Sequence, residues 1–387
     1  MHNALVLINS YFPTGVAMSS RMLNFSRLLR DAGWKVHVIA GHHVNPEIQI
    51  GKIYDIEGIP YQVTSSRKQS SFSTFFGEKC YIDAIENYIN NNHVDCVFTN
   101  SACETYGAIK KLCKRKGCSL FVEQCEWYDI SIYKFGRFDI RYLKTKKARD
   151  NGFAGAEGIV SISRLLNDYY TSIGKRSIRV PTILDVKNTK YRKCADETKE
   201  KIRIVFAGSL GGTKELMEPI LRALLCRAKY SKAITLDVYG PSKDEIIENI
   251  GGNSSLLSHL DRTVILHGRI PQDQVSEIFF QSDYLIFVRP NRRSSDAGFP
   301  TKFAESMAVG TPVITNNTGD VGLYLRDSVN GFMLQDSSWE SVARCFDRIL
   351  DVDRDSYVQL RDAARKTAEH YFDYRVYMES VSTFFSK

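Results

Sequence analysis

Twice along the chain, a short apolar strand is followed by a glycine-bearing turn and an amphipathic helix. The first repeat has an apolar run over 4–9 and a helical stretch over 20–32 whose apolar residues fall on one face. The second has an apolar run over 202–207, a glycine-rich loop over 208–213 and a predicted helix over 214–227. Strands that alternate with helices form parallel sheets with helices on both faces. The sequence therefore predicts an α/β protein of two Rossmann-like, doubly wound domains that face each other across a cleft.

The remaining apolar runs complete the two domains and set their boundaries. We expect strands in the first half over 35–40, 94–99, 119–123 and 158–161, and in the second half over 233–239, 264–267, 284–288 and 312–315. Between the halves, residues 186–200 are rich in Lys and poor in apolar residues, which is typical of a linker. The predicted domains are 1–185 and 201–370. Aromatic residues at near-helical spacing over 371–387 predict a final helix that packs back toward the first domain.

Composition places the chain among globular proteins. Of its 387 residues, 43% are hydrophobic and 25% are charged, and no apolar run approaches the about 18 residues of a transmembrane helix. The nine cysteines are odd in number and include no C-x-x-C pair, so neither a disulfide framework nor a metal site is expected. The apolar N-terminus lacks a basic region and a cleavage site, which favours a first buried strand over a signal peptide. We therefore expect a cytoplasmic protein.

Positive charge is clustered along the first half. The net charge is +8, and residues 134–149 carry seven cations against Asp139 alone, interleaved with aromatic and aliphatic side chains. A second basic run, 110–116, has five cations and no acid. Such segments can rest on an anionic membrane surface or meet an anionic substrate, and two solvated helix faces explain the same pattern. No nucleic-acid recognition motif accompanies the charge, so no nucleic-acid partner is expected.

One stretch of the second half carries the clearest signs of a ligand site. Residues 296–305 predict a glycine-bearing loop that leads into a short helix, and a helix start gathers backbone N–H groups that attract phosphate. Lys302 and Glu305 add a cation and a hydrogen-bonding carboxylate to that helix. An anion together with sugar hydroxyls would satisfy all of these groups. A plain helix start with two solvated charges is the alternative.

A dinucleotide enzyme is the obvious competitor, because both halves begin like nucleotide-binding units. Neither glycine loop contains the G-x-G-x-x-G pattern. The acidic residue expected about 20 residues later has no good candidate, since Asp237 lies inside a predicted strand. A nicotinamide or flavin enzyme is therefore not favoured.

Several short motifs follow one another in a fixed order along the chain. The most specific lie in the second half, at 206–209, 267–271, 297–305 and 310–314, and weaker ones lie in the first half, at 11–15, 31–39, 160–164 and 181–185. Together they resemble the retaining GT-B glycosyltransferases of glycosyltransferase family 4, over essentially the whole chain. The resemblance implies that 1–185 is the acceptor-side domain and that 201–370 binds a nucleotide-sugar donor.

The resemblance also implies roles for individual residues. Lys214 and Lys302 would stabilise the donor diphosphate and Glu305 would accept hydrogen bonds from ribose hydroxyls, so these three form the expected catalytic set. The expected donor-binding residues are Gly15, Ser209, Arg269, Ile270, Arg292, Asp296, Gly298, Phe299, Pro300 and Thr301. The expected acceptor-binding residues are Glu123, Glu126 and Trp127, at the end of a predicted strand, where aromatic faces and carboxylates suit a sugar. No metal or other cofactor is expected, because the nucleotide-sugar is a co-substrate.

The reaction that the resemblance implies needs no protein nucleophile. Transfer would proceed on one face of the donor, and catalysis would consist of positioning and of stabilising negative charge on the leaving diphosphate. The expected function is transfer from a UDP- or GDP-sugar to a glycan or lipid-linked acceptor with retention of configuration, in bacterial surface polysaccharide or glycolipid assembly. The enzyme would work in the cytoplasm, peripherally at the inner face of the membrane.

The chain departs from the family pattern at one position. Where the family has a first glutamate, the chain has Ala297, with Asp296 one residue away. This departure leaves open a non-catalytic partner in a glycosyltransferase complex, whose donor site would be degraded at Ala297. A sugar-nucleotide 2-epimerase is a second alternative because it shares the fold, although the loop over 296–305 fits transfer better.

Overall fold

The computed structural model divides the chain into two compact units. The first contains Met1–Leu184 together with Tyr374–Lys387, and the second contains Asp185–Asp373. The structure describes residues 2–45, 47–65, 73–100, 103–128, 130, 133–191, 201–210 and 214–386. Within these ranges, no helix is both long enough and apolar enough to cross a membrane.

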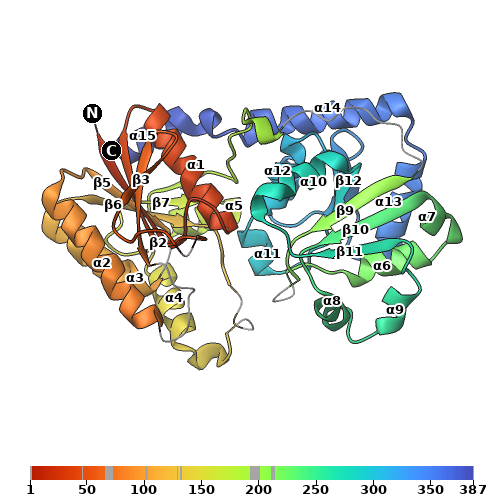
Figure 1. Cartoon of the computed structure of the whole chain (residues 1–387), viewed down its shortest axis with the longest axis horizontal. Coiled ribbons are helices and arrows are strands. Elements are labelled where there is room, and N and C mark those ends of the chain that lie inside the picture. The colour runs from red at the N-terminus through yellow and green to blue at the C-terminus, as the bar shows by residue number, and fades with distance from the viewer. Residues whose placement is uncertain are drawn as a thin grey trace. The chain divides into compact units, whose positions relative to one another are not determined.

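An eight-stranded sheet forms the centre of the first unit (Figure 1). Its order is β3-β4-β2-β1-β5-β6-β7-β8, in which β3 and β4 pair antiparallel and all other neighbours are parallel. The strands are β1 (Asn3–Tyr11), β2 (Lys35–His42), β3 (Ile53–Ile56), β4 (Ile59–Ser65), β5 (Cys96–Asn100), β6 (Ser119–Gln124), β7 (Gly158–Ser161) and β8 (Ser177–Arg179). The strands predicted in this half are confirmed. The hairpin of β3 and β4 escapes the sequence pattern because β3 is short and wholly exposed or half-exposed.

Helices and the returning C-terminus cover this sheet. The helices are α1 (Ala17–Asp31), α2 (Ser73–Asn91), α3 (Cys103–Lys116), α4 (Ile140–Asp150), α5 (Arg164–Ser172), η7 (Tyr374–Tyr377) and α15 (Met378–Ser386). In α15, the Phe385 ring stacks on Phe121 at 4.3 Å and meets Phe98 edge-on at 5.1 Å. The end of the chain is thus part of the first unit's hydrophobic core.

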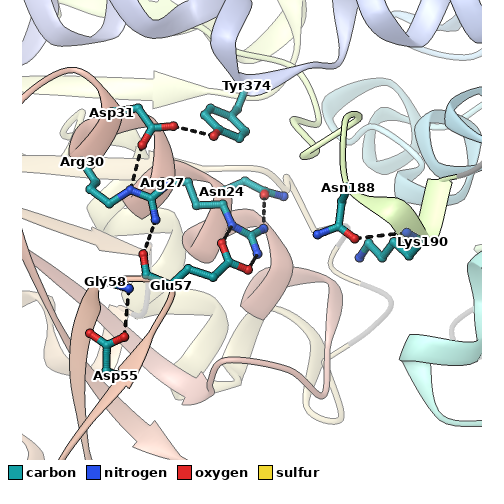
Figure 2. A network of polar contacts seen from close by, with 10 residues as sticks. All are labelled: Asn24, Arg27, Arg30, Asp31, Asp55, Glu57, Gly58, Asn188, Lys190 and Tyr374. Carbon is teal, nitrogen blue, oxygen red and sulfur yellow. Dashed lines mark hydrogen bonds and ion pairs between the residues drawn. The ribbon is translucent and has the colours of Figure 1, made fainter.

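A polar network ties α1 to the β3–β4 turn and to the returning chain (Figure 2). Arg27 forms a bidentate ion pair with Glu57, at 2.8 and 2.6 Å, and also donates to Asn24 Oδ1 at 2.8 Å. The Tyr374 hydroxyl donates to Asp31 Oδ2 at 2.6 Å. Bidentate Arg–carboxylate pairs are geometrically specific, so this network fixes how α1 sits on its sheet.

A six-stranded, wholly parallel sheet forms the centre of the second unit. Its order is β11-β10-β9-β12-β13-β14. The strands are β9 (Ile202–Ala207), β10 (Ile234–Tyr239), β11 (Val264–Gly268), β12 (Tyr284–Ile286), β13 (Val313–Asn316) and β14 (Gly331–Leu334). The order reverses between β9 and β12, and in such sheets ligands bind beyond the carboxyl ends of the strands at the reversal. The predicted fold class, α/β with two Rossmann-like domains, is confirmed.

The helices of the second unit follow their strands with one departure from the sequence pattern. They are α6 (Glu218–Leu225), α7 (Ala228–Ala233), α8 (Lys243–Asn249), α9 (Ser254–Ser258), α10 (Val275–Gln281), α11 (Arg293–Ala297), α12 (Thr301–Ala308), α13 (Trp339–Leu350) and α14 (Arg354–Tyr371). The helix predicted over 214–227 starts too early. Pro219 lies in the first turn of α6, where its missing N–H costs nothing, and Asn249 Nδ2 binds the Glu215 carbonyl at 3.0 Å in the non-helical segment before it. Lys214 therefore precedes this helix instead of opening it.

Candidate functional site

Three glycines bring the strand ends of the second sheet close together. Gly208 follows β9, Gly240 follows β10 and Gly268 ends β11, and all three have a positive φ (+155°, +109° and +70°). Gly208 N–H donates to the Tyr239 carbonyl at 3.0 Å, and Gly240 N–H donates to the Gly268 carbonyl at 2.7 Å. A Cβ on Gly240 would collide with the Gly208 carbonyl, and a Cβ on Gly208 with the Lys302 ammonium. This edge of the sheet therefore presents backbone instead of side chains.

A buried ion pair holds Lys302 beside Gly208. Its Nζ lies 2.6 Å from Glu215 Oε2, and the two side chains are only 14% and 7% exposed. The ammonium also lies over the rings of Phe206 and Phe287, at 4.8 and 5.6 Å. Burial lowers the pKa of Lys302, and the Glu215 carboxylate opposes this change and favours the charged form. The result is a cation held in place at the carboxyl end of β9.

The first turn of α12, which contains Lys302, also offers backbone N–H donors. Its N-cap residue is Pro300, and among the described hydrogen bonds none uses the N–H of Phe299, Thr301 or Lys302. Unpaired amides at a helix start, with the positive end of the helix dipole, attract anions. A lysine in that first turn adds a full charge to the partial one.

Glu305 lies three residues after Lys302 and therefore on the same side of α12. Burial raises the pKa of its carboxyl group to about 7, while the charges of Lys190 and Lys302 oppose the rise. No hydrogen bond to this carboxylate is found among the described residues. A half-buried carboxylate of this kind is suited to accept hydrogen bonds from the hydroxyls of a ligand.

Residues 296–300 are more ordered than the loop that the sequence predicts. The end of α11 occupies the start of this stretch, where Asp296 Oδ1 accepts a hydrogen bond from Gly319 N–H at 2.8 Å. Gly298 N–H donates to a carbonyl of α11 at 3.4 Å. The Phe299 ring is buried in an aromatic cluster with Phe303, Tyr324 and Phe372. Asp296 and Gly298 thus have partners within the unit, and their donor-binding role stays a prediction.

The other expected donor residues of the second unit have less definite geometry. Arg269 directly follows Gly268, and its largely exposed side chain pairs with Glu245 at 3.2 Å. Ile270 and Thr301 are half-buried, Ser209 directly follows Gly208, and Lys214 and Arg292 are exposed. The structure therefore brings Gly208, Lys302 and Glu305 together, whereas Lys214 lies outside the helix in which it was expected.

Sequence reasoning misses two groups that shape the site. Glu215, the partner of Lys302, lies 87 positions away in sequence, so no local pattern pairs them. His267 Nε2 lies 2.6 Å from Asp237 Oδ1, and its ring stacks on Tyr239 at 4.1 Å, which fixes the strand end before Arg269. For the His267–Asp237 pair, the only signal in the sequence is that Asp237 is an acid inside an otherwise apolar strand.

In the first unit, the expected acceptor residue Glu123 is enclosed. Its side chain has no exposed surface, and Oε1 pairs with Arg21 Nε at 2.7 Å. Arg21 also donates to the carbonyls of Pro181 and Val180, and the Cys125 thiol donates to Glu123 Oε2 at 3.1 Å. The prediction that Glu123 contacts an acceptor directly is therefore wrong, because both oxygens of its enclosed carboxylate have partners inside the fold.

The remaining first-unit predictions lie nearer the surface. Trp127 is half-buried, meets Tyr169 edge-on at 4.8 Å and has the Arg149 guanidinium over its ring at 4.3 Å. Glu126 is half-buried and its carbonyl accepts from the Gln124 side chain at 2.6 Å. Gly15 has φ +122°, and a Cβ there would lie 2.8 Å from a Val44 methyl group. These placements leave the sugar-binding roles of Gly15, Glu126 and Trp127 as predictions.

No group of His, Cys, Asp and Glu side chains that could hold a metal ion is present among the described residues.

Comparison with known proteins identifies the second unit at the level of family. Residues 187–367, nearly all of that unit, match the family model described as Glycosyl transferases group 1. No curated protein is matched by the sequence of the chain.

Solved structures match the fold over the whole chain. Sucrose-phosphate synthase from Thermosynechococcus elongatus superposes with a TM-score of 0.74 at 13% identity, covering 100% of this chain and 98% of its own. HepE of Anabaena, in complex with UDP and glucose, gives 0.69 at 14% identity with 100% of both chains covered. The lipopolysaccharide outer core galactosyltransferase WaaB gives 0.64 at 12% identity with 99% of both covered. At these identities, the matches establish the fold.

The matched fold is GT-B, with two Rossmann-like units. The family model covers the unit that holds Gly208, Lys302 and Glu305. Residues 187–367 of the chain belong to the group 1 glycosyl transferases, a family of retaining enzymes that transfer a sugar from a nucleotide-sugar donor.

Proposed function

We propose that this enzyme transfers the sugar of a UDP-sugar, with retention of configuration, to a glycan or lipid-linked acceptor in bacterial surface polysaccharide or glycolipid assembly. The observation that carries the proposal is the buried Lys302–Glu215 pair at the strand edge, with Glu305 on the same helix. UDP is favoured over GDP because HepE has UDP and glucose bound. The polysaccharide context follows from the likeness to WaaB, a lipopolysaccharide galactosyltransferase.

Each group has a role in this proposal. Lys302 and the first amides of α12 bind the diphosphate and stabilise the charge that develops on it as the glycosidic bond to the sugar breaks. Glu305 accepts hydrogen bonds from the ribose hydroxyls, and backbone at Arg269 and Ile270 meets the base. Lys214 supplies a second cation. The proton of the acceptor hydroxyl passes to the leaving diphosphate, so no protein base is required.

The acceptor side is proposed for residues 1–185, with Glu126 and Trp127 at the sugar. An aromatic face with a carboxylate nearby suits a saccharide. The reaction would take place in the cytoplasm, at the inner face of the membrane.

The proposal is tested by titrating the protein with a panel of UDP- and GDP-sugars and following the thermal midpoint. A ligand that binds only the native state raises this midpoint. A shift with the UDP series alone is expected. A shift with the GDP series alone would overturn the choice of base, and no shift with any member would favour a non-catalytic partner of a glycosyltransferase complex.

A Glu305→Gln variant is expected to be more stable than the wild type above neutral pH. The pKa of this carboxyl is raised in the fold from 4.5 to about 7, so the native state binds the proton more tightly than the unfolded chain does. The resulting stability is complete below about pH 4.5 and is lost as the pH rises through about 7. The loss is at most about 3 kcal/mol, and the variant avoids it. Urea unfolding at acid and alkaline pH measures the difference.

The same variant is expected to bind UDP-glucose about 10- to 100-fold more weakly at alkaline pH, because it loses hydrogen bonds to a charged group. Wild-type affinity should fall as the pH drops below about 7 and the carboxylate takes up a proton. The diphosphate diester of UDP-glucose does not titrate in this range, so the pH dependence belongs to the protein. Glu340→Gln, at an exposed carboxylate in the first turn of α13, is the matched control. Unchanged affinity and pH profile in Glu305→Gln would remove Glu305 from the nucleotide site.

A further inference from the structure

Large apolar side chains are exposed together on one stretch of the first unit. Phe135, Phe138 and Ile140 are 66%, 74% and 69% exposed, and Leu143, Tyr128 and Ile130 are exposed as well. Phe135 and Phe138 lie next to and in η2 (Gly136–Phe138), and Ile140 and Leu143 lie on α4. Exposed large apolar side chains that gather in one segment are typical of a surface that binds a partner or a membrane.

Cations are interleaved with these apolar side chains. Lys134 Nζ lies over the Phe135 ring at 5.7 Å, and the Arg137 guanidinium lies over the Phe138 ring at 5.2 Å. On α4, Lys144 and Lys147 are exposed. No ion pair of Lys134, Arg137, Lys144 or Lys147 is found among the described residues.

The acids of this segment are already neutralised. Asp139 is buried, caps α4 by accepting from Arg141 N–H and pairs with the Arg141 side chain at 3.1 Å. Asp150 pairs with Lys146 and Arg149. The exposed charge of the segment is therefore positive.

The geometry of α4 places apolar and basic side chains on a single face. Ile140, Leu143, Lys144 and Lys147 follow the i, i+3, i+4, i+7 spacing and are all exposed. On the opposite face, Tyr142 and Thr145 are half-buried and Arg149 is buried. The helix α4 packs against α3, whose last turn carries the exposed cations Lys114, Arg115 and Lys116, of which Arg115 pairs with Glu86 (Figure 1).

We propose that residues 134–147 form a docking surface for an anionic lipid bilayer. Phe135, Phe138, Ile140 and Leu143 would enter the interfacial layer, and Lys134, Arg137, Lys144 and Lys147 would meet lipid phosphates. Aromatic and aliphatic side chains beside lysines form the pattern of an interfacial helix, and each cation near an anionic leaflet strengthens binding about 5-fold. A protein partner would need acidic groups opposite each cation, whereas an anionic bilayer offers them at every position.

This docking surface deepens the proposed function. The inference rests on that function only for the reason why the enzyme would bind a bilayer. A lipid-linked acceptor is presented at a bilayer. An enzyme bound to the bilayer can therefore reach its acceptor while the lipid of the acceptor stays in the membrane. Vesicle binding is measured without donor or acceptor. Loss of nucleotide binding and loss of vesicle binding can therefore be told apart.

The test is sedimentation of the full chain with vesicles of phosphatidylcholine alone and with vesicles that also contain phosphatidylglycerol. We expect binding to the anionic vesicles, weakening as salt is added. Lys144→Gln/Lys147→Gln should bind about 20- to 30-fold more weakly, and Phe135→Ser/Phe138→Ser about 100-fold more weakly. Thermal stabilisation by UDP-glucose should be unchanged in both variants.

The controls change exposed residues of the same kinds in the second unit. Val329→Ser/Val358→Ser removes exposed apolar side chains, and Lys201→Gln/Lys243→Gln removes exposed cations. Both should bind anionic vesicles as the wild type does. Absence of wild-type binding, equal binding to neutral vesicles, or equal losses in variants and controls would each overturn the proposal.

Discussion

The Lys302→Met variant is expected to bind UDP about 10- to 100-fold more weakly than the wild type. A hydrogen bond between a charged donor and a phosphate is worth about 1.5–3 kcal/mol, and the ammonium is already held at the strand edge beside Gly208. Methionine keeps the length and apolar stem of lysine, so it should pack against Phe206 and Phe287 in the same way. Isothermal titration calorimetry with UDP measures the loss.

The same substitution leaves Glu215 buried without its partner, which should cost about 3–5 kcal/mol of folding free energy. Weak UDP binding alone could then reflect partial unfolding. The double variant Glu215→Gln/Lys302→Met removes both charges and should recover most of the stability while binding UDP as weakly as the single variant. If the double variant regains UDP affinity as well, Lys302 is only a structural partner of Glu215.

A buried ion pair contributes little net folding stability, because an apolar pair of similar volume often makes the fold at least as stable. Here the pair is placed where three glycines keep the strand ends bare, at the point where the strand order reverses. Burial lowers the pKa of Lys302 and raises that of Glu305, so it disfavours the charged form of each group in the absence of ligand. Groups that are costly in the empty protein and converge on one helix turn are best explained by what they bind.

The sequence predicts the fold well because its signals are local. Apolar runs over 158–161 and 202–207 coincide with β7 and β9, and the glycine turns mark the end of β9 and the break before β13. The errors also have local causes. Residues 214–217 look helical, but the side chain of Asn249 and the prolyl ring of Pro219 determine where α6 begins.

Only part of the candidate site can be predicted from the sequence, because the contacts that define the site join residues far apart in the chain. Lys302 and Glu305 stand out from the helix-start pattern, but nothing near them indicates that Glu215 pairs with Lys302. For Glu123, an acid at a strand end suggests a binding group, and only the partner on α1 shows that it is structural. A carboxylate's role depends on which cation the fold brings to it.

Replacing Arg21 with methionine is expected to destabilise the first unit by about 3–5 kcal/mol. The change removes the 2.7 Å ion pair with Glu123 and leaves a fully enclosed carboxylate without its cation. It also deprives the carbonyls of Val180 and Pro181 of their donors, at 2.9 and 2.7 Å. The measurement is urea unfolding followed by tryptophan fluorescence in a Trp339→Phe background, where the remaining tryptophans belong to the first unit.

Two comparisons separate the ion pair from simple loss of packing. Arg21→Met/Glu123→Leu removes both charges and should be more stable than Arg21→Met, since no charge stays buried alone. Arg27→Met breaks the pair with Glu57, whose side chain is 44% exposed, and should cost less than Arg21→Met because water can solvate the carboxylate left behind. If Arg27→Met lowers the free energy of unfolding as much as Arg21→Met does, the enclosure of Glu123 does not explain the effect of losing its ion pair. The exclusion of Glu123 from acceptor binding would then have to be reconsidered.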